Sequence, residues 1–301
     1  MSDVETVPYA ETRTTRLDPR WLAVVGLLGL LIWTYLPILR VLVREWQKNP
    51  NYSVGQLVPF AALYMLWTDR HRLARLTVRP SWVAGLVLIA VAQGVRFYGL
   101  MYLYESLERY SLILTVAGLV LLVAGRVVLQ HVIWVILFLF LMIPLPERVH
   151  NAISGPLQTV ATSGAVMTLE VMGVTVEQRG HQLELNGRTS VAVAEACSGL
   201  RMLTAFIMVS AVFAYIVNRP VWQKLVLLAS SVPIAIVCNL VRLVVTSVLF
   251  MWTTTEVASK FSHDFAGLTM MPLAVLMLMG ELWLLSRLVI EEQREPAKIS
   301  V

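Results

Sequence analysis

The feature that most constrains this chain is a series of long apolar runs. A helix needs about 20 mostly apolar residues to cross the hydrocarbon core of a bilayer, because each residue advances it by about 1.5 Å. Such runs recur along the chain, and they predict spans near 21–43, 55–68, 81–104, 110–127, 129–145, 198–217, 222–251 and 265–288. The sequence therefore predicts an all-α, polytopic membrane protein with about eight transmembrane helices.

Composition supports one membrane domain rather than several soluble ones. Hydrophobic residues make up 57% of the chain and charged residues only 14%, whereas soluble domains have about 45–50% and about 25%. We expect a single membrane domain over 21–290, with polar tails at 1–20 and 291–301. The first apolar run is long and lacks a small-residue cleavage pattern, so we expect a retained span rather than a signal peptide.

The basic residues of the short loops predict the orientation of the chain. Loops rich in arginine and lysine stay in the cytoplasm. With eight spans, the following basic residues all fall on one side: Arg13, Arg16, Arg20, Arg70, Arg72, Arg75, Arg79, Arg126, Arg219, Lys224, Arg294 and Lys298. Both termini are then cytoplasmic, although Arg44 and Lys48 in the first outer loop oppose this mildly. The net charge of +5 is explained by these topology signals, and we expect no nucleic-acid binding.

This topology places the segments 44–54, 146–197 and 252–264 on the outer side. Residues 147–172 of the long segment mix small, polar and apolar residues without a clean span. We expect them to form an amphipathic helix lying in or near the membrane interface.

A small β element is predicted after that helix. Alternating apolar runs at 182–185 and 191–194 flank Asn186-Gly187, and a short alternating run at 174–177 precedes them. Asn-Gly between alternating runs is typical of a type I′ turn. We therefore expect a β-hairpin on the outer face, just before Cys197.

Cys197 is the first candidate for chemistry, in Glu195-Ala-Cys-Ser-Gly-Leu-Arg201 at the start of the sixth predicted span. A helix N-terminus favours the thiolate, which is the nucleophile, and its free N–H groups can hold an oxyanion. Gly199 permits close backbone approach, and Arg201 projects from the same helix face. The alternative is a small buried apolar residue. A bridge to Cys238 stays open, but Cys238 lies inside an apolar run.

Arg242 and His263 are the other two candidates. Arg242 lies deep in the seventh span, where a charge is costly and is a functional candidate by default, and Asn239 shares its helix face. His263 precedes Asp264 at the outer start of the eighth span, where an imidazole can exchange protons near neutral pH. The alternative for Arg242 is that its side chain snorkels to the interface or pairs with a structural carboxylate. The alternative for His263 is an interfacial histidine without a role. Together the three supply the thiol, cation and proton carrier that acyl transfer requires.

These motifs resemble the exosortase/archaeosortase family in order and spacing. The matching stretches are Asn51-Tyr-Ser-Val-Gly-Gln-Leu-Val-Pro59, Ile143-Pro-Leu-Pro-Glu147, Glu195-Ala-Cys-Ser-Gly-Leu-Arg201, Asn239-Leu-Val-Arg242 and His263-Asp-Phe-Ala-Gly267. The family pattern commonly has histidine where Val54 stands, which leaves any role of that position in doubt. The resemblance covers most of the chain, about 20–290.

The resemblance implies a membrane cysteine protease or transpeptidase of the bacterial inner membrane, with its active site on the periplasmic side. Its partners would be exported proteins that carry a C-terminal sorting signal: a Pro-Glu-Pro type motif, a transmembrane helix and a basic tail. Carried over by position, Cys197 is the nucleophile, Arg242 the cationic partner and His263 the general acid and base. Supporting roles fall to Glu195, Arg201, Asn239 and Asp264. The acceptor would be an amine, a hydroxyl of a surface glycan or membrane lipid, or water.

No cofactor or metal is expected, because the five histidines are scattered without ligand spacing. Three other functions stay open. A transporter of polysaccharide or lipid would line its path with the intramembrane residues Arg96, Arg242 and Glu281. Transporters more often have paired broken helices, whereas this sequence predicts one strong break, at Pro233. An intramembrane serine protease lacks a suitable serine context. A non-catalytic scaffold is disfavoured because all three candidate residues are present.

Overall fold

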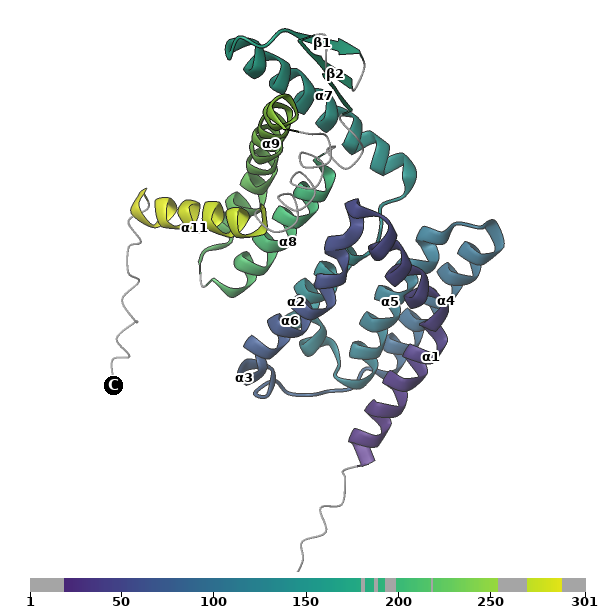
Figure 1. Ribbon diagram of the computed structural model, residues 1–301. Helices are drawn as coiled ribbons and strands as arrows, with labels where there is room; N and C mark the ends of the chain where they lie inside the picture. The colour runs from purple at the N-terminus through teal and green to yellow at the C-terminus, as the bar shows by residue number, and fades with distance from the viewer. Residues whose placement is uncertain are drawn as a thin grey trace, which may run out of the picture.

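The protein is almost entirely helical (Figure 1). The computed structural model describes residues 19–179, 182–186, 189–192, 199–217, 219–253 and 270–288. Its helices are α1 (Pro19–Lys48), η1 (Pro50–Leu57), α2 (Val58–Thr68), α3 (Arg70–Leu73), α4 (Trp82–Tyr102), α5 (Glu105–Val123), α6 (Arg126–Phe138), η2 (Leu139–Met142), α7 (Glu147–Val171), α8 (Leu200–Ile216), α9 (Val221–Trp252) and α11 (Met270–Leu288). Each predicted span thus contains a helix.

Four of these helices are long and apolar enough to cross a membrane: Val24–Lys48, Trp82–Tyr102, Glu105–Val123 and Val221–Trp252. A fifth crossing results if Arg126–Met142 and Glu147–Val171, which meet at 81°, are one broken span. Helix α8 is apolar but has only 17 residues. The chain is therefore a multi-pass helical membrane protein with four to five candidate spans among its described residues, and a total of eight stays a prediction.

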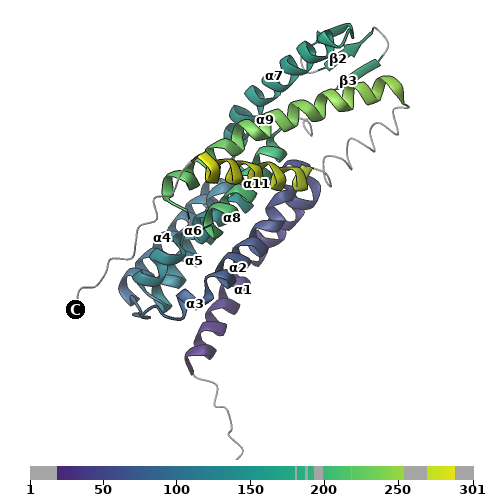
Figure 2. The same ribbon diagram turned by 90° about the vertical axis from the view of Figure 1, so that its left-hand side faces the viewer.

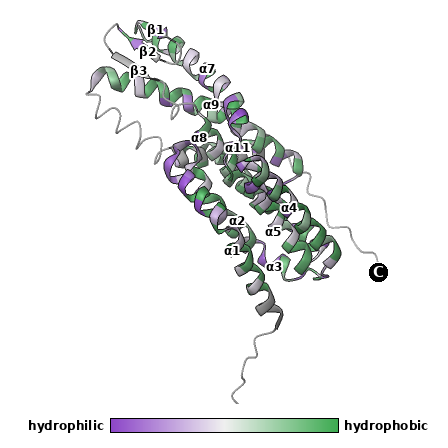
Figure 3. Cartoon of the chain, turned by 90° about the vertical axis from the view of Figure 1, so that its right-hand side faces the viewer, coloured by the Kyte–Doolittle hydropathy of each residue, from purple (hydrophilic) through white to green (hydrophobic). Residues whose placement is uncertain are grey.

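The outer surface of the helices is apolar, as lipid contact requires (Figure 3). Trp33 of α1 is 77% exposed and Val83 of α4 is 78% exposed. Many other large apolar side chains are exposed along the same helices. A soluble monomer rarely shows apolar patches of this extent, because water would disfavour them. The surface therefore fits a hydrocarbon environment.

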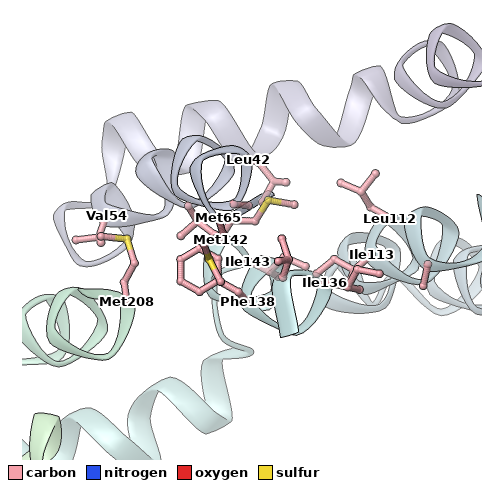
Figure 4. Close-up of a cluster of buried hydrophobic side chains, with 14 of the residues drawn as sticks. Leu42, Val54, Met65, Leu112, Ile113, Ile136, Phe138, Met142, Ile143 and Met208 are labelled. Carbon is pink, nitrogen blue, oxygen red and sulfur yellow. The ribbon is translucent and has the colours of Figure 1, made fainter. Parts of the chain in front are cut away.

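The helices form two groups that meet along α8 (Figures 1 and 2). Helices α1, α2, α4, α5 and α6 form the first group, and α7, α8, α9 and α11 form the second. Their shared core brings together Val54 of η1, Met65 of α2, Met142 of η2 and Met208 of α8 (Figure 4). Unbranched methionine side chains fill irregular gaps between helices that cross at different angles.

Glycines allow α4 and α5 to approach each other closely. A Cβ on Gly85 would lie 2.6 Å from the Cα of Leu122, and a Cβ on Gly118 would lie 2.7 Å from the side chain of Ile89. Exclusion of water does not drive helices together in hydrocarbon, and small residues at a helix interface allow the close van der Waals packing that does. The tight α4–α5 hairpin therefore depends on these two positions.

A buried polar network joins α1 to α4 and α5. The hydroxyl of Tyr35 lies 3.1 Å from Ser111 Oγ and 2.8 Å from Thr115 Oγ1. Gln93 donates to Tyr35 over 3.2 Å, and the guanidinium of Arg96 lies 4.6 Å from the centre of the Tyr35 ring. Arg96 also donates to the Thr34 carbonyl at 3.0 Å. Arg96 is therefore part of a local interhelical contact.

The predicted helix over 147–172 is confirmed as α7, which packs along α9 (Figure 2). Its position at a membrane interface stays a prediction. Helix α9 runs through Pro233 without interruption, so the break that a transporter would use is not present there. Cys238 is a free, buried thiol whose Sγ lies 3.4 Å from Met277 Sδ.

The β element is a three-stranded antiparallel sheet of order β1 (Val176–Arg179), β2 (Gln182–Leu185) and β3 (Thr189–Ala192). The predicted hairpin is thus confirmed, but its type I′ turn is wrong. Leu185 pairs with Thr189, so three residues separate the strands instead of two. Asn186 has φ 52°, a left-handed conformation that asparagine adopts more readily than most residues. Pairing of β1 with β2 was not predicted.

Gly85→Ala tests the close contact between α4 and α5. The added methyl group meets the Leu122 backbone, which cannot move aside as a flexible side chain would, so we expect a loss of about 1–3 kcal/mol of unfolding free energy. Unfolding in detergent micelles measures it. Gly94→Ala on the same helix meets nothing within 4 Å and should be neutral or slightly stabilising. Equal stability of the two variants would contradict the packing described.

Candidate functional site

The start of α8 packs against the middle of α9. Gly199 caps α8 with φ 79°, and a Cβ at this position would lie 2.8 Å from Asn239 Nδ2. A non-glycine residue would be strained by the positive φ and would also push against the Asn239 amide. The glycine of the Cys-Ser-Gly sequence is therefore required by both conformation and contact.

Asn239 connects this helix start to Arg242. Arg242 Nη2 donates to Asn239 Oδ1 over 2.9 Å, and the side chains are 3% and 2% exposed. The two residues are three apart on α9, so they share one helix face. A buried guanidinium is stable only where oxygen acceptors satisfy it. The pair therefore supplies a fixed positive charge and an amide beside the N-terminus of α8.

A narrow crevice lies at this junction. Its walls are Gly199 and Leu203 of α8, Asn239 and Ala235 of α9, and Leu157 and Ala161 of α7. Apart from Asn239 the lining carries no polar side chain. In such an apolar setting an electrostatic interaction is stronger than in water.

Arg201 lies in the first turn of α8, two residues beyond Gly199, and is partly exposed. Its carbonyl accepts a hydrogen bond from Thr204 Oγ1 at 3.0 Å. Thr204 also lines a second small crevice, together with Asn51 and Tyr52 of η1. The same turn of α8 therefore faces η1.

Tyr52 and His150 form a pair that sequence reasoning missed. The Tyr52 hydroxyl lies 2.7 Å from His150 Nδ1, and the residues are 98 positions apart. Burial raises the pKa of Tyr52, partly offset by a backbone hydrogen bond from Leu145. The hydroxyl therefore stays protonated at neutral pH and can donate to the imidazole. No local spacing could have revealed this contact.

The two family-like stretches outside the main motifs contribute Val54, Val58 and Ile143 to one hydrophobic core. Trp46 Nε1 donates to the Met142 carbonyl at 2.9 Å, and Gly55 lies against both residues. Val54 is 7% exposed and belongs to the hydrophobic core. The position where the family pattern has histidine is thus a packing position in this chain.

The other candidates lie outside the described residues: Cys197, Glu195, His263 and Asp264. Of the predicted site residues, the structure places Arg242 and Asn239 together and sets Arg201 on the adjoining helix start. Within the described part of the chain, no group of three or more histidine, cysteine or acidic residues could hold a metal ion.

One family model matches the chain. A model described as a transmembrane exosortase (Exosortase_EpsH) matches residues 46–280. This stretch runs from the end of α1 into α11 and contains all the candidate residues. No curated protein and no solved structure matches the chain.

Gly199→Ala tests the junction of α8 and α9. Positive φ and the Asn239 contact both oppose the new methyl group, so we expect a loss of about 2–4 kcal/mol of unfolding free energy, measured in detergent. Gly173→Ala is the control, because Gly173 has φ 84° but nothing within 4 Å of a Cβ. The Gly173→Ala variant should lose only about 1–2 kcal/mol of unfolding free energy, which is the cost of backbone strain alone. If both variants lose the same amount, the Asn239 contact contributes nothing.

Proposed function

Because the chain belongs to the transmembrane exosortase family, we propose that it is a membrane cysteine protease or transpeptidase acting through a thioester on Cys197. Its substrates would be exported proteins whose C-terminal sorting signal is cut at the outer face of the bacterial inner membrane. The alternative function is that of a transporter or export component for polysaccharide or lipid.

The contact between Gly199 and the Asn239–Arg242 pair is the observation that supports this proposal most directly. Gly199 is two residues after Cys197, and residues two apart have Cα atoms no more than about 7 Å from each other. The contact therefore brings the chain segment of the proposed nucleophile close to the buried cation of α9. A fixed cation near a thiol is what acyl transfer needs, because negative charge develops on the attacked carbonyl.

The proposed reaction has two halves. The Cys197 thiolate attacks the scissile carbonyl carbon and forms a tetrahedral oxyanion, which Arg242 or the free N–H groups at the start of α8 would stabilise. The C–N bond then breaks, His263 donates a proton to the leaving amine, and a thioester remains. An amine, hydroxyl or water gives its proton to His263 and attacks the thioester, which releases the thiolate.

Supporting residues would hold these groups in position. Asn239 already fixes the direction of the Arg242 guanidinium through their hydrogen bond. Asp264 would orient His263, and Glu195 and Arg201 would contact the substrate near the nucleophile. These roles follow from chain position and from the motif that the residues share.

The arrangement of the basic loops supports the proposed orientation. Tyr215 at the end of α8 donates to Asp69 Oδ2 over 2.8 Å, and Arg72 lies 3.7 Å from the same carboxylate. The arginine-rich segment after α2 thus meets the end of α8 that is opposite to Gly199. If that end is cytoplasmic, the Gly199 junction faces the periplasm and both termini are in the cytoplasm.

The transporter alternative receives no specific support. Arg96 stacks on Tyr35, Arg242 binds Asn239, and Glu281 accepts a hydrogen bond from Ser230 at 2.6 Å. Each of these charged residues thus has its own local partner: Tyr35 on α1 for Arg96, Asn239 on the same helix for Arg242, and Ser230 on α9 for Glu281. A transport path for a polar solute would need these charged residues to line one cavity.

Cys197→Ala tests the nucleophile. Cells would co-express the full-length protein with a reporter that carries a Pro-Glu-Pro type motif, a transmembrane helix and a basic tail. We expect wild type to shorten the reporter and Cys197→Ala to slow processing at least about 10³-fold, because no other group forms the thioester. Cys238→Ala is the matched control and should process normally, since Cys238 packs against Met277. Shortening by both variants would rule out the mechanism.

Arg242→Lys tests the cation. Lysine keeps the charge but lacks the planar fork that reaches both Asn239 and a substrate oxyanion. We expect the rate of processing to fall about 10²-fold, with a smaller change in substrate affinity. Arg287→Lys, on the exposed face of α11, serves as the control. An unchanged rate in Arg242→Lys would remove Arg242 from the catalytic group.

A further inference from the structure

A pocket of about 330 Å³ lies between α6, α8 and α9, away from the Gly199 junction. Its volume is within the range of small-molecule sites, about 300–1,000 Å³. Three helical stripes and Met65 of α2 line it. The stripes are Trp134, Leu137, Phe138 and Leu141; Ala211, Ala214 and Tyr215; and Val221, Lys224, Leu225 and Leu228. In each stripe the residues follow the i, i+3, i+4 spacing, so each stripe is one face of a helix or its continuation.

The shape of the pocket suits an extended apolar chain. The stripe from Trp134 to Leu141 runs about 10 Å along α6 and η2, and it is apolar throughout. Opposite it, Ala211 and Ala214 are small and leave room between the helices. A slot walled in this way accepts methylene groups and offers a polar solute no partners.

The mouth of the pocket faces the lipid-exposed surface. Trp134 is 61% exposed, Val221 is 69% exposed and Leu225 is 56% exposed. These residues belong both to the pocket lining and to the apolar outer surface of the helices. A chain can therefore enter from the side, directly from the bilayer.

Lys224 is the only charged residue among the lining residues that the structure describes. Its ammonium makes no hydrogen bond or ion pair with any residue that the structure describes. Asp69, which accepts a hydrogen bond from the lining residue Tyr215 at 2.8 Å, is also engaged by His131 Nε2 at 3.0 Å. The ammonium is thus available to an anion at the edge of an apolar slot.

We propose that this pocket binds an anionic phospholipid of the surrounding bilayer, with one acyl chain in the slot and its phosphate on Lys224. A basic residue between helices near the cytoplasmic surface is a favourable site for an anionic head group. The site is separate from the proposed catalytic junction. Gly199 and Tyr215 are at opposite ends of α8, about 24 Å apart along its axis. The lipid would hold α6, α8 and α9 together.

Native mass spectrometry of the full-length protein tests this proposal. The protein would be released from nanodiscs that contain equal amounts of phosphatidylglycerol and phosphatidylethanolamine. We expect wild type to retain one phosphatidylglycerol in preference to phosphatidylethanolamine. Lys224→Gln should lower that retention about fivefold, the effect of one lost charge contact. Lys48→Gln, which removes another lysine far from the pocket in sequence, should not change it.

A second pair of variants tests the slot. Ala214→Trp fills it and should abolish retention of both lipids, whereas Ala84→Trp on the exposed face of α4 should have no effect. If Ala214→Trp does not fold, Ala211→Phe narrows the same slot at a partly exposed position. Equal retention of the two lipids in wild type, or undiminished retention in Lys224→Gln and the slot variants, would overturn the proposal.

The reporter assay tests the other possible occupant of the pocket, the transmembrane helix of a substrate. If the slot variants keep their lipid but lose processing, the pocket receives the helix of a substrate and the lipid proposal is wrong. Lipid retention is measured directly, so the result does not depend on whether Cys197 is the nucleophile.

Discussion

Helices in this protein are held together by close contact, because exclusion of water cannot drive association within hydrocarbon. In a bilayer every backbone N–H and C=O must be satisfied inside its own helix, so helix pairs are selected by small residues and a few polar bonds. Gly85 and Gly118 allow α4 to lie on α5, and Tyr35 ties α1 to both. Gly199 does the same for α8 and α9. The candidate site is therefore built on the same kind of contact that builds the fold.

Sequence patterns predicted the helices well because an apolar run is a local signal. Every predicted span contains a helix, and the helix over 147–172 and the β-hairpin are present. The sequence-based prediction was wrong where one or two residues decide the local backbone conformation. The Asn186-Gly187 pair suggested a two-residue turn, but the strand register leaves a three-residue loop. The buried side chains of Leu183 and Leu185 fix this pairing.

The site was predictable in its residue types but not in its contacts. A charge within an apolar run marked Arg242, and the Cys-Ser-Gly sequence marked the start of α8. Nothing local indicated that Gly199 would meet Asn239, or that Tyr52 would meet His150 from 98 positions away. Such pairs depend on how helices cross, which is set by the packing of many side chains at once. The roles of Cys197 and His263 stay predictions.

The small sheet has a consequence for how accurately the site is assembled. Leu183 and Leu185 are fully buried in one cluster with Leu243, the residue directly after Arg242. Strand β3 ends at Ala192, and the chain reaches Gly199 after six further residues. The sheet is thus attached to the α9 turn that carries the cation and, through the chain, to the start of α8. If α9 shifts within the bilayer, the sheet moves with it, because Leu183 and Leu185 share one buried cluster with Leu243.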